Sequence, residues 1–146
     1  MIHFTFAGVH LRASFGFFAL LAIFLFVDAG GFALAFLGGA ALHELGHLLA
    51  MGVFGVGIRL VELRGGGLII HRDERHHTSF WQEVIILLSG AGANILAAVC
   101  LYIMGGDGAL RFSAANTALA ICHLLPIPGL DGGTLAALFF HRLKGS

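Results

Sequence analysis

The apolar stretch Phe32–Phe54 constrains the fold of this chain most strongly, because a run of this length is typical of a helix that crosses a membrane. In its middle lies the pentapeptide HELGH, residues 43–47. Leu45 lies 13 residues after Phe32, a separation of roughly 20 Å along a helix. That distance lies well inside a hydrocarbon core of about 30 Å. Ionisable side chains at such a depth are costly and mark functional sites.

The composition of the whole chain also favours a membrane protein. Of the 146 residues, 58% are hydrophobic and only 11% are charged, and the mean hydropathy is +0.94. A soluble globule of this size cannot bury so much apolar surface, so we expect an integral membrane protein in contact with the lipid bilayer. The net charge of zero gives no sign of nucleic-acid binding. The length predicts a single domain over residues 1–146.

Three further apolar stretches lead to the prediction of an all-α polytopic membrane protein with about four transmembrane helices. They are Leu11–Val27, Val84–Met104 and 110–143, and the last is broken at Pro126 and Pro128. The first stretch also resembles a cleaved signal peptide, but a retained helix is the preferred interpretation.

Shorter, more polar segments connect these helices. Residues 1–10 are mixed and predict an interfacial strand or arm. Residues 56–71 alternate loosely around a glycine run, which predicts a small β-hairpin or re-entrant sheet. A charged loop follows at 72–77, and Ser79–Glu83 predicts the start of the third long helix.

The basic residues predict how the chain is oriented in the membrane. With the N-terminus in the cytoplasm, seven of the eight fall on the cytoplasmic side and only Arg111 falls outside. This asymmetry favours four spans with both termini cytoplasmic. The seven are Arg12, Arg59, Arg64, Arg72, Arg75, Arg142 and Lys144.

The HELGH pentapeptide has the residue types and spacing of a metal-dependent hydrolase. His43 and His47 lie one helical turn apart on the same face, so both rings can bind one metal ion. Glu44 can then act as general base on a water at that metal. HExxH is the signature of zinc hydrolases, so we expect one Zn²⁺ per chain.

A catalytic zinc site needs a third protein ligand. Among the eight acidic residues, only Glu44 and Asp131 lie deep inside apolar segments. Asp131 follows the two prolines, and the break lets its carboxylate turn towards a neighbouring span. We therefore assign Asp131 as the third ligand. His123 is the competing ligand, and its alternative role is to line the cavity.

These motifs resemble the site-2 protease family of intramembrane zinc metalloproteases, in which HExxH in one transmembrane helix pairs with LDG in a later one. Here HELGH precedes LDGG at residues 130–133. Between them, residues 89–94 resemble the GPxxN segment of the family, and residues 124–128 resemble its NLLPxxP segment. Ala91 stands where proline is usual, and His123 stands where asparagine usually precedes LLP.

The resemblance implies a small, bacterial-type member without PDZ or CBS domains, located in the bacterial plasma membrane. The implied activity is regulated intramembrane proteolysis, in which a peptide bond is hydrolysed within or near a transmembrane segment of a membrane-protein substrate. The resemblance also implies that Asn94 hydrogen-bonds the substrate backbone or the oxyanion, and an interhelical amide bond is the alternative. The sheet-like segment 56–71 offers an edge for an unwound substrate strand. The sequence is compatible with an oligomer.

Two other functions fit parts of the pattern. A catalytically silent, protease-like membrane protein could keep the metal for structure or sensing, although such a site has no need of Glu44. A transporter or metal carrier could use intramembrane histidine and aspartate, but its polar residues would be strung across the membrane rather than gathered at one depth. We therefore expect a zinc metalloendopeptidase.

Overall fold

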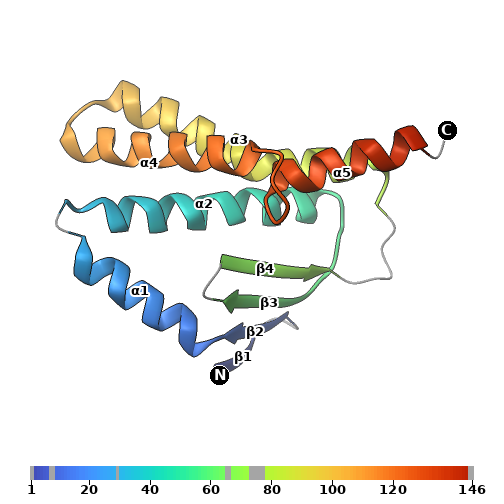
Figure 1. The fold of residues 1–146 in the computed structure, drawn as a ribbon, viewed down its shortest axis with the longest axis horizontal. Helices are drawn as coiled ribbons and strands as arrows, with labels where there is room; N and C mark the ends of the chain where they lie inside the picture. The colour runs from blue at the N-terminus through green and yellow to red at the C-terminus, as the bar shows by residue number, and fades with distance from the viewer. Residues whose placement is uncertain (1, 7–8, 29, 65–66, 73–77, 145–146) are drawn as a thin grey trace.

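Five helices and four strands make up the part of the chain that the computed structural model describes, residues 2–6, 9–28, 30–64, 67–72 and 78–144. Three long helices lie side by side in Figure 1 and form one layer of the molecule. They are α2 (Phe32–Val53), α3 (Phe80–Met104) and α4 (Asp107–Leu124).

The last helical segment is interrupted where the sequence predicts it. α4 ends at Leu124, and α5 (Asp131–Lys144) begins after a loop that contains both prolines. α5 then runs on in the general direction of α4 (Figure 1). The break therefore places the first residue of α5 beside the middle of the helical layer rather than at its end.

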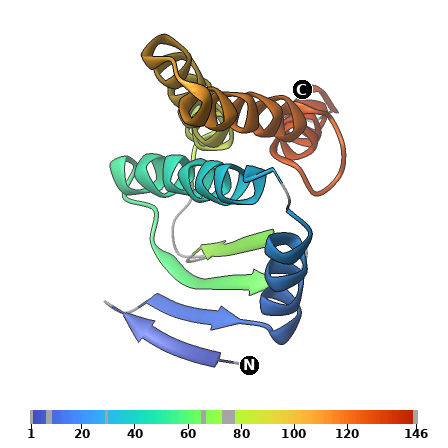
Figure 2. The ribbon, with the colours of Figure 1, turned by 90° about the vertical axis from the view of Figure 1, so that its left-hand side faces the viewer.

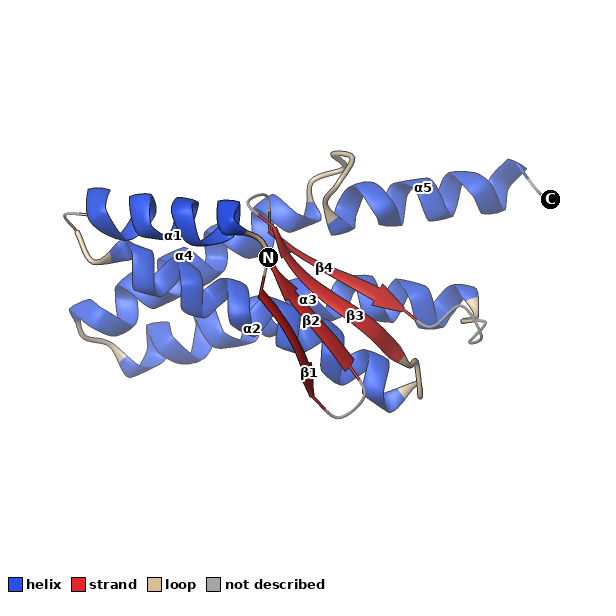
Figure 3. Ribbon diagram, turned by 90° about the horizontal axis from the view of Figure 1, so that it is seen from below, coloured by secondary structure: helices blue, strands red, loops and turns tan. Residues whose placement is uncertain are grey.

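The strands form a second layer, a four-stranded sheet in the order β1-β2-β3-β4. Their bounds are Ile2–Phe6, Val9–Ala13, Ile58–Arg64 and Gly67–Arg72. β1–β2 and β3–β4 are antiparallel pairs, whereas β2 and β3 are parallel. Figure 2 shows the sheet below α2 with α1 (Phe15–Val27) at one side, and Figure 3 shows the four strands from the side opposite the helices.

The sheet is larger than the hairpin that the sequence predicted within a mostly helical chain. The hairpin expected at 56–71 is present as β3 and β4, but it is only half of the sheet. The N-terminal arm supplies the other half, and residues 11–13, predicted as helix, belong to β2. Local periodicity could not show this, because β2 pairs with a strand that follows two helices. Residues 65–66 and 73–77 of the predicted hairpin turn and charged loop lie outside the described residues.

A small hydrophobic core joins the two layers. It consists of Met51 of α2, Val56 between α2 and β3, and Ile86 of α3. Ile58 and Ile70 of the sheet pack against it. Ile86 is fully buried. This cluster fixes the sheet against α2 close to the HELGH pentapeptide.

Two of the described helices, α2 and α3, are long and apolar enough to cross a membrane. Large hydrophobic side chains are exposed on the helices, with Phe26 93%, Val53 82% and Ile103 77% exposed, which suits contact with lipid tails. α1 has 13 residues, or roughly 20 Å, which is short for a span. The molecule is mostly helical and consistent with a membrane protein, and the count of four spans stays a prediction.

Asp28 connects α1 to α2 and caps the start of α2. Its Oδ1 accepts hydrogen bonds from the N–H groups of Gly30 (3.2 Å) and Phe32 (3.0 Å), and its Oδ2 accepts one from Ala33 (2.8 Å). These amides otherwise lack partners, and the negative charge lies at the positive end of the helix. The Ala33 N–H is the main reason that the pKa of Asp28 lies below its usual 3.8.

Replacing Asp28 with alanine should lower the thermal stability of the chain at neutral pH, because three hydrogen bonds are lost. The lowered pKa means that the carboxylate stabilises the fold above pH 3.8 and loses this effect as the pH falls through the lowered value. The difference in melting temperature between wild type and Asp28→Ala should therefore shrink in acid. Asp28→Asn keeps an acceptor and serves as the control. Thermal unfolding in detergent measures both effects, and a pH-independent difference would contradict them.

Candidate metal centre

The helical periodicity of α2 brings the two histidines of HELGH together. Their ring centroids are 4.7 Å apart, and their Nε2 atoms are separated by 3.1 Å. Both side chains are buried, with His43 2% and His47 7% exposed. Two ring nitrogens so close together in a buried site are suited to sharing a cation.

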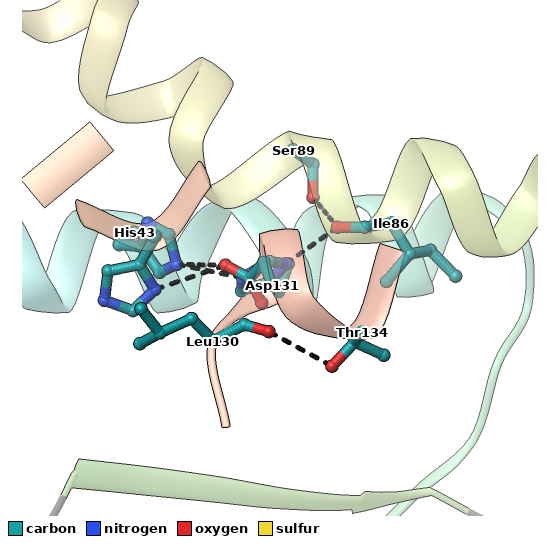
Figure 4. Close-up of polar contacts among 8 residues, drawn as sticks. His43, Ile86, Ser89, Leu130, Asp131 and Thr134 are labelled. Carbon is teal, nitrogen blue, oxygen red and sulfur yellow. Dashed lines mark hydrogen bonds and ion pairs between the residues drawn. The ribbon is translucent and has the colours of Figure 1, made fainter. Parts of the chain in front are cut away.

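Asp131, the first residue of α5, completes the cluster. Its Oδ2 lies 2.9 Å from the Nε2 of His43 and 3.3 Å from the Nε2 of His47. Figure 4 shows Asp131 and His43 facing each other from α5 and α2. Within the described part of the chain, these three residues are the group that could hold a metal ion. The sequence therefore anticipated which residues the fold brings together.

The size of this cluster fits a zinc ion. Ligand atoms about 2.0–2.1 Å from tetrahedral zinc lie about 3.3 Å from one another. The three distances here are 3.1 Å, 2.9 Å and 3.3 Å. The donor set of two imidazoles and one carboxylate is also one that zinc uses in catalytic sites. The three residues could thus bind the metal with little rearrangement.

A hydrogen bond from α3 orients the His47 ring. Its Nδ1 lies 2.7 Å from the backbone oxygen of Ile86, which also accepts from the hydroxyl of Ser89 (Figure 4). A carbonyl oxygen only accepts, so Nδ1 carries a proton, and in the neutral ring the lone pair of Nε2 is free to bind a metal ion. This is the tautomer that a metal ligand requires.

Two glycines allow the helices to approach this site closely. A Cβ on Gly90 of α3 would overlap the Nε2 of His47 and lie 2.8 Å from the Nε2 of His43. A Cβ on Gly132 would overlap the backbone of Leu124, at the end of α4. The first glycine lets α3 cross the imidazole rings, and the second lets α5 start against the end of α4. Close packing of α5 against α4 therefore explains why a glycine follows Asp131.

Glu44 lines a cavity of about 190 Å³ together with the three candidate ligands. The remaining lining residues are Met51, Ile70, Arg72, Leu87, His123 and Gly129. The Glu44 side chain is partly buried, and the cavity has room for water beside the candidate ligands. Its position is therefore suited to proton transfer at the centre.

His123, the competing third ligand, lies next to the cluster. Its Nδ1 is 3.2 Å from Asp131 Oδ2, and its ring centroid is 3.9 Å from that of His43. Three ring nitrogens therefore surround one carboxylate oxygen. This arrangement suits a positioning contact to Asp131 as well as the cavity-lining role that the sequence allowed.

Asn94 is buried away from this cavity. The side chain is 0% exposed, and neither its Nδ2 nor its Oδ1 has a hydrogen-bond partner among the described residues. Asn94 is not one of the residues that line the cavity. The contact with substrate that the resemblance implies stays a prediction, and the alternative interhelical amide bond is not formed with any described residue.

The sequence did not single out Arg72 as a site residue. It was placed in the charged loop, whereas it ends β4, lines the cavity and contacts both carboxylate oxygens of Glu83 at 2.7 Å. Ile70, two residues earlier, lines the same cavity. The two-residue alternation of a strand was the signal that could have placed both on one face.

The fold matches that of a solved protease structure. The chain superposes on the site-2 protease from Methanocaldococcus jannaschii with a TM-score of 0.76, over 97% of this chain and 72% of that one, at 20% identity. The chain has the site-2 protease fold. The resemblance read from HELGH and LDGG is thereby confirmed for the fold. No family model matches the sequence, and neither does any curated protein.

Gly90→Ala should reduce metal binding at least about tenfold, a loss typical of disturbed ligand surroundings, because the new methyl group displaces the His47 ring. Gly92→Ala, on the same helix, is the matched control, since a Cβ there meets nothing within 4 Å. Titration of the metal-free variants with Co²⁺, followed by its absorption spectrum, gives the affinity. Equal affinities of the two variants would show that α3 does not confine the rings.

Proposed function

We propose that this chain is an intramembrane zinc metalloprotease that cuts a peptide bond within or near a transmembrane segment of a membrane-protein substrate. The observation that carries the proposal is the placement of Glu44 in one cavity with His43, His47 and Asp131, within a site-2 protease fold. A metal site kept only for structure has no need of a carboxylate facing the same space.

His43, His47 and Asp131 would hold the zinc ion. When bound, zinc lowers the pKa of a water molecule and polarises the scissile carbonyl group. The Nδ1–H of His47 stays bonded to Ile86, which keeps the lone pair of Nε2 towards the centre. The contact of His123 Nδ1 with Asp131 restrains the carboxylate in the same way.

Glu44 moves the protons of the reaction. One of its carboxylate oxygens takes a proton from the attacking water and later delivers a proton to the leaving amine. The side chain is adjacent in sequence to His43 and shares its cavity, so both transfers occur without rearrangement of the helix. A glutamine at this position has no basic oxygen for the first transfer, although it fits the same space.

The substrate enters in extended form. A helix is about 10–12 Å across with its side chains, and a cavity of about 190 Å³ cannot admit one. β4 is an edge strand of the described sheet, and its residues Ile70 and Arg72 line the cavity. The outer edge of β4 can therefore bind an unwound substrate strand through backbone hydrogen bonds, close to the metal centre.

The protein lies in the bacterial plasma membrane with four spans and both termini in the cytoplasm. The distribution of basic residues supports this orientation. The start of α4, near Arg111, and the end of α5, near Arg142 and Lys144, lie at opposite ends of the molecule in Figure 1. This separation supports an orientation in which the two groups of charges face opposite membrane surfaces.

Glu44→Gln should retain the metal and abolish cleavage. The substitution keeps the volume of the side chain and removes its basic oxygen. Purified wild type and variant are compared by metal content and by cleavage of candidate transmembrane substrates in detergent or liposomes. Equal cleavage by the two proteins would refute the proposal, and metal loss in the variant would show that Glu44 is a ligand instead.

Asp131→Ala and His123→Ala together identify the third ligand. Loss of a partner that supports a ligand weakens metal binding by about tenfold, which we expect for His123→Ala. Asp131→Ala should have a larger effect, because the atom that contacts both Nε2 atoms is removed. Metal affinity is measured by competition with a chelator of known affinity. A larger loss for His123→Ala would transfer the ligand assignment to His123.

A further inference from the structure

A second cavity, of about 440 Å³, opens on the sheet and is separate from the metal centre in its chemistry. It lies where β2 and β3 begin and β4 ends. Three of its six lining residues are arginines, and the lining residues are His10, Arg12, Arg59, Leu60, His71 and Arg72. Three arginines in one cavity are a notable concentration in a chain with only eight basic residues.

The register of the strands explains most of this gathering. His10 and Arg12 are two apart on β2 and therefore lie on one face of the sheet. His10 pairs with Leu60 of β3, and Leu60 in turn pairs with His71 of β4. Three adjacent strands thus present these side chains to the same space.

Arg59 joins them through an irregularity in β3. By simple alternation it would lie on the face opposite Leu60. The pairing of β3 with β4 shifts register between Ile58 and Leu60, as in a β-bulge. Such a bulge redirects a side chain, and Arg59 accordingly lines the cavity together with Leu60.

The ion pairs leave one guanidinium uncompensated. Buried Glu62 contacts Arg12 at 3.8 Å and His71 at 3.3 Å, and Glu83 holds Arg72. Arg59 forms no ion pair or hydrogen bond with another described residue. The carboxylates thus hold the neighbouring side chains in place, while the Arg59 guanidinium has no carboxylate partner among the described residues.

We propose that this cavity binds a phosphate group, with Arg59 as its principal ligand and Arg12 beside it. A guanidinium group offers paired N–H donors that match phosphate oxygens. The cavity lies at the end of the sheet near the start of α3, where Trp81 is 63% exposed. Exposed tryptophan at a helix end is typical of the lipid headgroup region. A headgroup phosphate of an anionic phospholipid therefore meets the cavity at the right level.

The test uses the full chain in detergent and native mass spectrometry. The probes are dioctanoyl phosphatidylglycerol, dioctanoyl phosphatidylcholine and inorganic phosphate. We expect phosphatidylglycerol to bind, and Arg59→Gln to weaken its binding about tenfold through loss of a charge-assisted hydrogen bond. Arg111→Gln is the matched control, because it removes the same charge outside the cavity.

The outcomes separate the sources of the phosphate. Binding of phosphatidylglycerol alone assigns a lipid, and competition by inorganic phosphate assigns a soluble phosphate ligand. Equal weakening by Arg59→Gln and Arg111→Gln, or no binding of either anionic probe, would overturn the site. Arg59→Lys keeps the charge without the planar fork and should bind with intermediate affinity, and the metal content of each variant reports that the fold is intact.

Discussion

The arrangement of the helices depends on the meeting of three ring nitrogens at one carboxylate oxygen. His43 and His47 come from α2, His123 from α4 and Asp131 from α5, and each nitrogen lies within 3.3 Å of Asp131 Oδ2. An unbroken helix through residues 125–130 would carry Asp131 away from α2. The interruption after Leu124 therefore allows Asp131 to contact the three histidines. These contacts are favourable because buried polar groups need partners.

The sheet connects this cluster to the second cavity. Its side towards α2 is apolar and contributes Ile58 and Ile70 to the core. Arg72 lines both cavities and is held by Glu83 of α3. An ion pair at the start of α3 thus supports the rim of the metal centre and the rim of the cationic cavity. A substitution that displaces Arg72 would therefore alter the lining of both cavities.

The sequence predicted α2 and α3 closely, because long apolar runs are local signals. It also predicted that Asp131 shares a metal site with the histidines of HELGH, since few acidic residues lie inside apolar segments. The pairing of the N-terminal strands with β3 and the role of Arg72 were beyond its reach, because both depend on contacts between distant segments. The burial of Asn94 away from the cavity likewise follows from how α3 rotates against its neighbours, which spacing along the chain does not specify.

The parallel pairing of β2 with β3 sets an order of events during synthesis. Both α1 and α2 lie between these strands in the chain. β2 can therefore complete its hydrogen bonds only after the segment carrying the histidines has left the ribosome and β3 has followed it. Until then the edge of β2 that later pairs with β3 has no partner strand. β2 and β3 therefore pair only after both helices have been made, so the nascent chain must keep that edge protected until then.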